Sequence, residues 1–270
     1  MKKILIIINV HNGLIYIRNA IESVINQKYP VNLLIIDNAS SDGTDLIAKS
    51  YVGSCVEYIR INNKITLGAA RNYALNYIVD YDYFGFLDVD DVIIDDSYIK
   101  SIIEILSFND VSFIYSNASI YKDGIHIGNF SKSNDKLITK KDILKRYDIC
   151  FSSVIFVSKI FNNNKIRFKE NLSICEDTDI ILTILKFGKG YYINKKYIIF
   201  NISESSTLLN NIKKFSEELS FISKIYKLCF SERYYLNLVL FKTVISNFFK
   251  IGLYDSLIVL IMGVKNLMHE

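Results

Sequence analysis

The chain has 270 residues, of which 50% are hydrophobic and 22% are charged, and its net charge is +4. Such a chain is expected to fold around a large core, and because it lacks dense basic clusters we expect no nucleic-acid partner. The four cysteines are far apart and form no C-x-x-C, which argues against zinc and against a disulfide framework and favours a cytoplasmic location.

Apolar runs of strand length alternate with helical patterns over residues 1–116. Because these runs are continuous, their strands are expected to be buried on both faces, as in a parallel sheet covered by helices. The first run is shorter than a signal peptide requires and lacks a cleavage site. The sequence therefore predicts an α/β fold. The runs are ILIIIN (4–9), LLIID (33–37), VEYIRI (56–61) and FGFLD (84–88).

The second half of the chain has a looser pattern. Short strands and Asn/Lys-rich loops are expected over residues 117–207, which complete a domain over residues 1–207, and a helical extension is expected over residues 208–270. The extension could lie on an anionic membrane surface or pack on the domain or on a second subunit of a homodimer. Its longest apolar stretch, residues 256–264, is about half the length that spans a bilayer, so no transmembrane segment is expected.

Polar side chains stand at three of the predicted strand ends, in residues 9–12, 37–40 and 88–91. Ligands of open parallel sheets bind beyond the carboxyl ends of the strands, so these loops are expected to form one site. In extended backbone Asp88 and Asp90 would project to the same face, where their charges repel unless a cation, a proton or solvent relieves them. For any single loop, an ordinary solvated turn remains the alternative.

Four segments resemble, in order and spacing, the nucleotide-binding half of the family 2 glycosyltransferases. They are LIIINVHNGLIYIRNAIESVINQ (5–27), IIDNASSDGT (35–44), LGAARNYAL (67–75) and FLDVDD (86–91). This resemblance implies a GT-A fold, with a mixed, mainly parallel sheet flanked by helices. It also implies a nucleotide sugar, a UDP-sugar in the first place, as the donor.

The D-x-D segment is similar to the family's metal motif. The resemblance implies that Asp90 and Asp88 hold Mn²⁺ or Mg²⁺ at the donor diphosphate, with Asp88 nearer the ribose, while Asp91 completes the loop. A hard cation with oxygen ligands neutralises the charge that gathers on a leaving diphosphate. Arg71 matches the family's diphosphate-contacting arginine, and a guanidinium near a helix start suits phosphate oxygens.

Other positions match the family's base-binding and ribose-binding loops. Asp37 matches a loop aspartate that helps to hold the base and ribose, and Asn38 stands where a second aspartate is frequent. Asn9 and His11 stand where a proline and an aromatic residue are usual, although an imidazole can still stack on a pyrimidine. Gly68 is displaced toward the helix from the family's usual position.

The segment CEDTD, residues 175–179, resembles the Glu-Asp motif of the inverting members. The resemblance implies that Asp177 removes the proton of the acceptor hydroxyl and that Glu176 orients the acceptor. An alcohol needs such a base because it is a poor nucleophile until its proton leaves. The alternative is that these carboxylates only stabilise the start of a helix. In the later segment 201–209, Ser203 replaces a frequent histidine, so no metal ligand is assigned there.

The sequence thus predicts an inverting, metal-dependent glycosyltransferase that acts on a hydroxyl of a bacterial surface glycan or of its lipid-linked precursor. It would work in the cytoplasm or on the inner face of the cytoplasmic membrane. Two alternatives stay open. One is a haloacid-dehalogenase-like phosphatase with Asp88 as nucleophile, although that motif normally ends a first strand. The other is a non-catalytic module that binds a nucleotide sugar.

Overall fold

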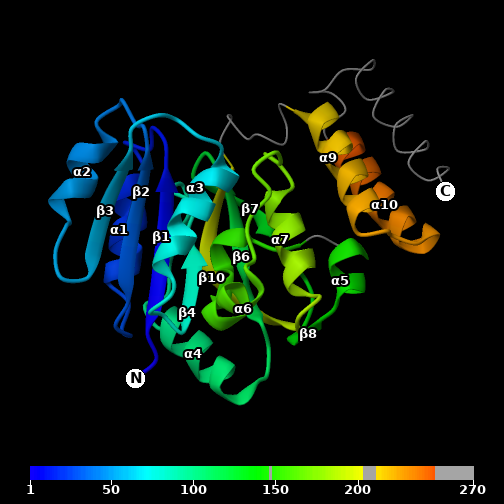
Figure 1. Cartoon of the computed structure of the whole chain (residues 1–270), viewed down its shortest axis with the longest axis horizontal. Coiled ribbons are helices and arrows are strands. Elements are labelled where there is room, and N and C mark those ends of the chain that lie inside the picture. The colour runs from blue at the N-terminus through cyan, green and yellow to red at the C-terminus, as the bar shows by residue number, and fades with distance from the viewer. Residues whose placement is uncertain (146–147, 203–210, 247–270) are drawn as a thin grey trace.

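A computed structural model describes residues 1–145, 148–202 and 211–246. It shows one mixed sheet between two layers of helices (Figure 1). The order of the strands along the main path is β3-β2-β1-β4-β9-β6-β10-β5. The α/β prediction is therefore confirmed.

The first half of the sheet is the predicted set of parallel strands. They are β1 (Ile4–Val10), β2 (Asn32–Asn38), β3 (Val56–Ile61) and β4 (Tyr83–Phe86). β1 lies between β2 and β4, and its register pairs Val10 with Asp37. The carboxyl ends of these neighbouring strands therefore open on the same edge of the sheet, as the sequence predicted.

The second half of the sheet is mostly antiparallel and was not predicted in detail. β10 runs parallel to β6 over ten residue pairs with two register shifts, and β9 lies antiparallel between β4 and β6. The short strands β5, β7 and β8 pair antiparallel with β10, β6 and β10, respectively. The bounds are β5 (Val92–Ile93), β6 (Phe113–Lys122), β7 (Ile125–Asn129), β8 (Lys136–Ile138), β9 (Ile155–Val157) and β10 (Gly190–Ile202).

Helices cover both faces of the sheet, which explains the continuous apolar strands. Successive side chains of a strand point to opposite faces, so Ile6 and Ile8 pack with α1 and α4 while Leu5 and Ile7 face the other cluster. On the first face lie α1 (Ile17–Ile25), α2 (Thr44–Ser50) and α4 (Tyr98–Phe108). On the second lie α3 (Leu67–Ala74), α5 (Lys140–Lys145), α6 (Ser158–Asn164), α7 (Glu176–Ile184), α9 (Ile212–Ile225) and α10 (Phe230–Ser246).

The described part of the C-terminal extension packs on the domain, which was one of its expected alternatives. Phe215, Leu219 and Ile222 of α9 and Leu236 of α10 are buried in the second face's core. The expected domain boundary at residue 207 and the expected departure at residue 203 lie outside the described residues. Within the described ranges no helix combines the length and the apolar character that crossing a membrane requires, and residues 256–264 lie beyond those ranges.

Candidate active site

The loops after β1 and β2 are joined by hydrogen bonds at the carboxyl edge of the sheet. The Nδ1–H group of His11 donates to the carbonyl oxygen of Asn38 at 2.8 Å. The backbone N–H of Asn12 donates to Ser40 Oγ at 3.0 Å, and the N–H of Ser41 donates to Asn12 Oδ1 at 2.8 Å. The predicted convergence of these two loops is therefore present.

Asp37 holds its own loop instead of facing the open edge. Its carboxylate is fully buried and accepts hydrogen bonds from the N–H of Ser40 at 2.8 Å, Tyr58 Oη at 2.6 Å and Arg60 Nη1 at 2.9 Å. Burial, with Asp37 beside it, raises the pKa of Tyr58 to about 12, so the phenol stays a donor. Direct contact of Asp37 with a base, as expected from the sequence, would first have to displace one of these partners.

The hydrogen bonds of Asn38 require an amide side chain, at the position where the resemblance leads us to expect a second aspartate. Its Nδ2 donates to the carbonyl oxygen of Ile65 at 2.9 Å, and its Oδ1 accepts from the N–H of Ile65 at 2.9 Å. A carboxylate could accept but could not donate here. Asn38 therefore fastens the loop that leads into α3.

The D-x-D segment forms a turn rather than the extended backbone expected from the sequence. The N–H of Asp91 donates to the carbonyl oxygen of Asp88 at 3.0 Å. The chain bends because Asp91 is drawn inward: its buried carboxylate accepts from the hydroxyl of Ser152 and from the N–H of Asn201 at 3.1 Å. The expectation that Asp88 and Asp90 alternate along a strand is therefore wrong, whereas the structural role of Asp91 is clear.

Asp88 and Asp90 nevertheless lie close enough to interact. The side chain of Asp88 is 41% exposed, and its Oδ1 accepts from Arg71 Nη2 at 3.1 Å. Burial and the charge of Asp88 raise the pKa of Asp90 to about 6. A divalent cation would relieve this repulsion. Among the described residues no group of three or more His, Cys, Asp or Glu side chains could hold a metal ion. The two carboxylates offer oxygen ligands of the kind that Mg²⁺ takes together with phosphate oxygens.

Arg71 connects the two halves of the site. It is only 2% exposed, and its Nη1 donates to Glu176 Oε1 at 3.1 Å while Nη2 bonds Asp88. Its guanidinium lies 4.4 Å from the centre of the Phe151 ring, where the ring face attracts the cation. The sequence predicted a phosphate-binding arginine, and the structure shows this arginine buried between two carboxylates.

Glu176 and Asp177 begin α7 at this junction. Burial raises the pKa of Glu176 to about 7, although Arg71 acts in the opposite direction. Glu176 Oε2 and Arg71 Nε are buried and have no hydrogen-bond partner among the described residues. Asp177 is half-buried, and one of its oxygens accepts from the N–H of Thr178. Asp88 and Glu176 thus bond one guanidinium, and Asp90 and Asp177, the residues expected for metal and base, lie two and one residues further along the chain.

Sequence reasoning missed how the start of α3 docks onto the second half of the domain. Asn72 Nδ2 donates to the carbonyl oxygen of Phe168 at 3.0 Å, and the N–H of Phe168 donates to Asn72 Oδ1 at 2.8 Å. A Cβ atom on Gly68 would lie 3.0 Å from the carbonyl oxygen of Lys169. The displaced glycine therefore permits a close approach. Asn72 of the Ala-Arg-Asn sequence and the displacement of Gly68 were the available signals for these contacts.

Asn9 and His11 lie at the same edge of the sheet. Asn9 Oδ1 is buried and has no hydrogen-bond partner within the described ranges, while His11 uses its Nδ1 on Asn38. Gly13 packs against Val89: a Cβ there would lie 2.9 Å from Val89 Cγ2. The first loop therefore touches the D-x-D turn, and all three predicted loops adjoin.

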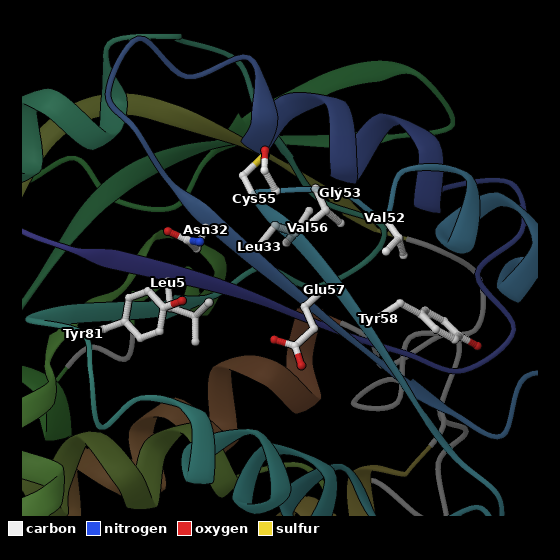
Figure 2. Close-up of a pocket in the computed structure, with 11 residues that line it drawn as sticks. Leu5, Asn32, Leu33, Val52, Gly53, Cys55, Val56, Glu57, Tyr58 and Tyr81 are labelled. Atoms are coloured by element: carbon white, nitrogen blue, oxygen red, sulfur yellow. The ribbon is translucent and has the colours of Figure 1, made fainter.

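A separate pocket lies at the opposite edge of the sheet. The pocket has a volume of about 310 Å³. Figure 2 shows Leu5, Asn32, Glu57 and Tyr81 among the residues that line it. Leu5 and Asn32 pair at the amino ends of β1 and β2. Because ligands of open parallel sheets bind at the carboxyl ends, this pocket does not belong to the candidate site.

Comparisons with known proteins agree with the geometry. The sequence profile described as "Glycosyl transferase family 2" matches residues 5–163. A glycosyltransferase of Rickettsia typhi is 24% identical over 82% of this chain and 72% of its own length. The poly(ribitol-phosphate) beta-N-acetylglucosaminyltransferase TarP of Staphylococcus aureus is 27% identical over 88% of this chain and 75% of its own length. The minor teichoic acid biosynthesis protein GgaB of Bacillus subtilis is 27% identical over 71% of this chain, which spans 22% of GgaB.

Solved structures share the fold. The crystal structure of S. aureus TarS 1-349 in complex with UDP gives a TM-score of 0.75 at 18% identity, covering 98% of this chain and 81% of that chain. The mannosyltransferase PcManGT from Pyrobaculum calidifontis, in complex with GDP-Man and Mn²⁺, gives a TM-score of 0.65 at 12% identity, covering 100% of this chain and 81% of that chain. These likenesses establish the GT-A fold.

Proposed function

The chain belongs to glycosyl transferase family 2, and from that premise we propose that it transfers a sugar from a UDP-sugar to a hydroxyl group of a bacterial surface polymer or of its lipid-linked precursor. The names of TarP and GgaB, which concern poly(ribitol phosphate) and teichoic acid, support this class of acceptor. The TarS structures with UDP and UDP-GlcNAc support a UDP-sugar donor.

One observation carries the proposal: Arg71 bonds both Asp88 of the D-x-D turn and Glu176 of the Glu-Asp pair. A sugar transferase needs charge neutralisation at the leaving diphosphate and a base at the attacking hydroxyl, close to the same anomeric carbon. The Arg71 bridge brings the groups suited to these two tasks to one place. In contrast, the phosphatase alternative needs its nucleophile after a first strand, and Asp88 follows β4.

We assign the residues as follows. Asp90 and Asp88 would hold Mn²⁺ or Mg²⁺, which supplies positive charge at the diphosphate. Asp177 accepts the proton of the acceptor hydroxyl as its oxygen forms a bond to the anomeric carbon. The bond between that carbon and the diphosphate oxygen breaks on the opposite face, so the configuration inverts, and the diphosphate leaves with the bonding electrons. Glu176 and Arg71 fix the geometry of the two ends. Arg71 adds positive charge on the side of the diphosphate, and the acidic cluster favours the positive charge that develops on the sugar.

The test is a release assay with a panel of UDP-, GDP- and other nucleotide sugars, beginning with UDP-GlcNAc. We expect UDP release that depends on added Mn²⁺ or Mg²⁺, that stops with a chelator, and that rises when a polyol-phosphate or lipid-linked acceptor is added. Hydrolysis of phosphate esters without sugar transfer would support the phosphatase instead. Nucleotide-sugar binding without any turnover would identify a binding module.

A further inference from the structure

Helix α9 reaches across to the start of α7, which carries Glu176 and Asp177. Figure 1 shows α9 beside α7, at the end of the molecule opposite β3. From α9, Glu218 sends its carboxylate into the segment just before α7. It is 5% exposed and accepts four hydrogen bonds there. The donors are the N–H and Oγ of Ser173 at 3.0 and 3.2 Å, the N–H of Ile174 at 3.0 Å and the N–H of Cys175 at 2.9 Å.

Glu218 anchors the segment that leads into α7. It binds the N–H groups of residues 173–175, which end at Cys175, the residue before the helix, and Cys175 makes no side-chain cap of its own. The first turn of α7 already holds Glu176, Asp177 and Asp179, which satisfy the helix dipole. A further carboxylate adds repulsion at this end of the helix. Its contribution is therefore the geometry of the segment rather than additional charge.

A second contact from the same helix region anchors α7 just past Asp177. The hydroxyl of Tyr226, which follows the last residue of α9, lies 2.8 Å from the carbonyl oxygen of Asp179 and 3.0 Å from its Oδ1. The buried carboxylate of Asp179 also accepts from Lys169 Nζ at 3.0 Å. Asp177 thus lies between two anchored residues. Cys175 is bonded by Glu218 of α9, and Asp179 is bonded by Tyr226, just after α9.

We infer that α9 sets the position of the proton acceptor, with Glu218 as a positioning residue for Asp177. This inference rests on the proposed function, in which Asp177 takes the proton of the acceptor. Displacing a catalytic group by about 1 Å can lower the rate about 100-fold without affecting parts of the ligand bound elsewhere. Arg71 bonds Glu176 in the segment that a loss of Glu218 would loosen, but its bond to Asp88 lies outside that segment, so donor binding is expected to change much less than kcat.

The test compares Glu218→Gln with Glu217→Gln, which makes the same change at the neighbouring, exposed position of α9. An amide oxygen cannot replace both carboxylate oxygens toward the N–H groups of residues 173–175. For Glu218→Gln we expect kcat to fall about 10- to 100-fold with the KM for the donor within about twofold. Amide hydrogen exchange of residues 172–178 should become faster. Glu217→Gln should match the wild type in all three measurements.

A double-mutant cycle with Asp177→Asn separates positioning from general stability. If Glu218 acts through Asp177, Glu218→Gln should cause no further loss of kcat in the Asp177→Asn background. An unchanged kcat in the single variant, or fully additive losses, would overturn the inference.

If the wild type transfers no sugar at all, the proposed function fails. Equal amide exchange of residues 172–178 in the Glu218 and Glu217 variants would separately overturn the anchoring by Glu218. If Glu218→Gln does not fold, Tyr226→Phe takes its place, with the same cycle and a smaller loss.

Discussion

The loops after β2 and the cluster around Arg71 use their polar groups in opposite ways. The side chains of Asp37 and Asn38 form their hydrogen bonds with other groups of the chain: Ser40, Tyr58, Arg60 and the backbone of Ile65. In the Arg71 cluster, Glu176 Oε2 and Arg71 Nε are buried without partners among the described residues, and the pKa of Asp90 is raised. Buried polar atoms are normally paired, so an unpaired set marks where a ligand is needed. The first region is framework, and the second is where chemistry is expected.

The largest effect should come from Asp177→Asn. An amide cannot accept the acceptor proton, and general base catalysis contributes about 10²- to 10⁴-fold, so kcat should fall by that amount. The Kd for the UDP-sugar, measured by calorimetry, should stay within about threefold because donor contacts lie elsewhere. Equal losses of transfer and of donor binding would show that Asp177 belongs to the donor site instead.

Arg71→Met and Arg60→Met should separate the two regions by what each one loses. Removing the buried Arg71 guanidinium leaves two carboxylates without their cation, which should lower the free energy of unfolding by about 3 kcal/mol and also stop transfer. Arg60→Met should lower stability, since Asp37 loses a partner, but leave kcat nearly unchanged. Urea unfolding and UDP release measure the two effects. If Arg60→Met stopped transfer in folded protein, the contrast between framework and chemical cluster would be wrong.

Glu176→Gln should change how stability depends on pH. The pKa of Glu176 is raised to about 7 in the folded chain, chiefly by burial, so between about pH 4.5 and pH 7 the folded state binds a proton that the unfolded state has lost. Stability from this group is therefore present at low pH and is lost as pH rises, by about 3 kcal/mol over the interval. Urea unfolding at pH 5 and pH 7 should show about 2 kcal/mol of this fall in the wild type and in the exposed control Glu104→Gln, and a smaller fall in Glu176→Gln.

The smallest effect should come from Asn38→Asp. A carboxylate would face the carbonyl oxygen of Ile65 and could not donate to it, which should cost about 1–3 kcal/mol of unfolding free energy. The activity of the folded fraction should be retained, because this contact belongs to the framework. Thermal unfolding followed by circular dichroism measures the shift; a variant as stable as the wild type would show that the two bonds to Ile65 contribute little.

The first half of the fold could be predicted because its signals are local. Continuous apolar runs such as residues 4–9 and 33–37 identify buried parallel strands, and parallel strands must open their carboxyl ends on one edge. The second half depends on pairings between distant segments, such as β10 with β6, and on register shifts near Ile193. Short runs of residues carry no periodicity that fixes such partners.

The sequence named candidate site residues but not the contacts between them. The D-x-D, Ala-Arg-Asn and Glu-Asp segments identified Asp88, Arg71 and Glu176, yet only tertiary packing shows that Arg71 lies between the two acids. The partners of Asp37 come from β3, whose register against β2 the sequence does not specify. The contacts of Glu218 could not be predicted from the sequence, because the pattern of an amphipathic helix indicates which face is buried but not which segment covers it.

The buried carboxylate of Asp91 ties together three stretches that leave the ribosome at different times. It accepts from Ser152 and from the N–H of Asn201, which follow it in the chain by 61 and 110 residues. Chains are made from the amino terminus, and their early segments can fold while later ones are still absent. The parallel strands β1 to β4 are complete long before Asn201 emerges. The turn that bears Asp88 and Asp90 therefore acquires its final shape only after Asn201 has been made, so a nascent chain that stops before Asn201 would carry the parallel strands without the finished turn.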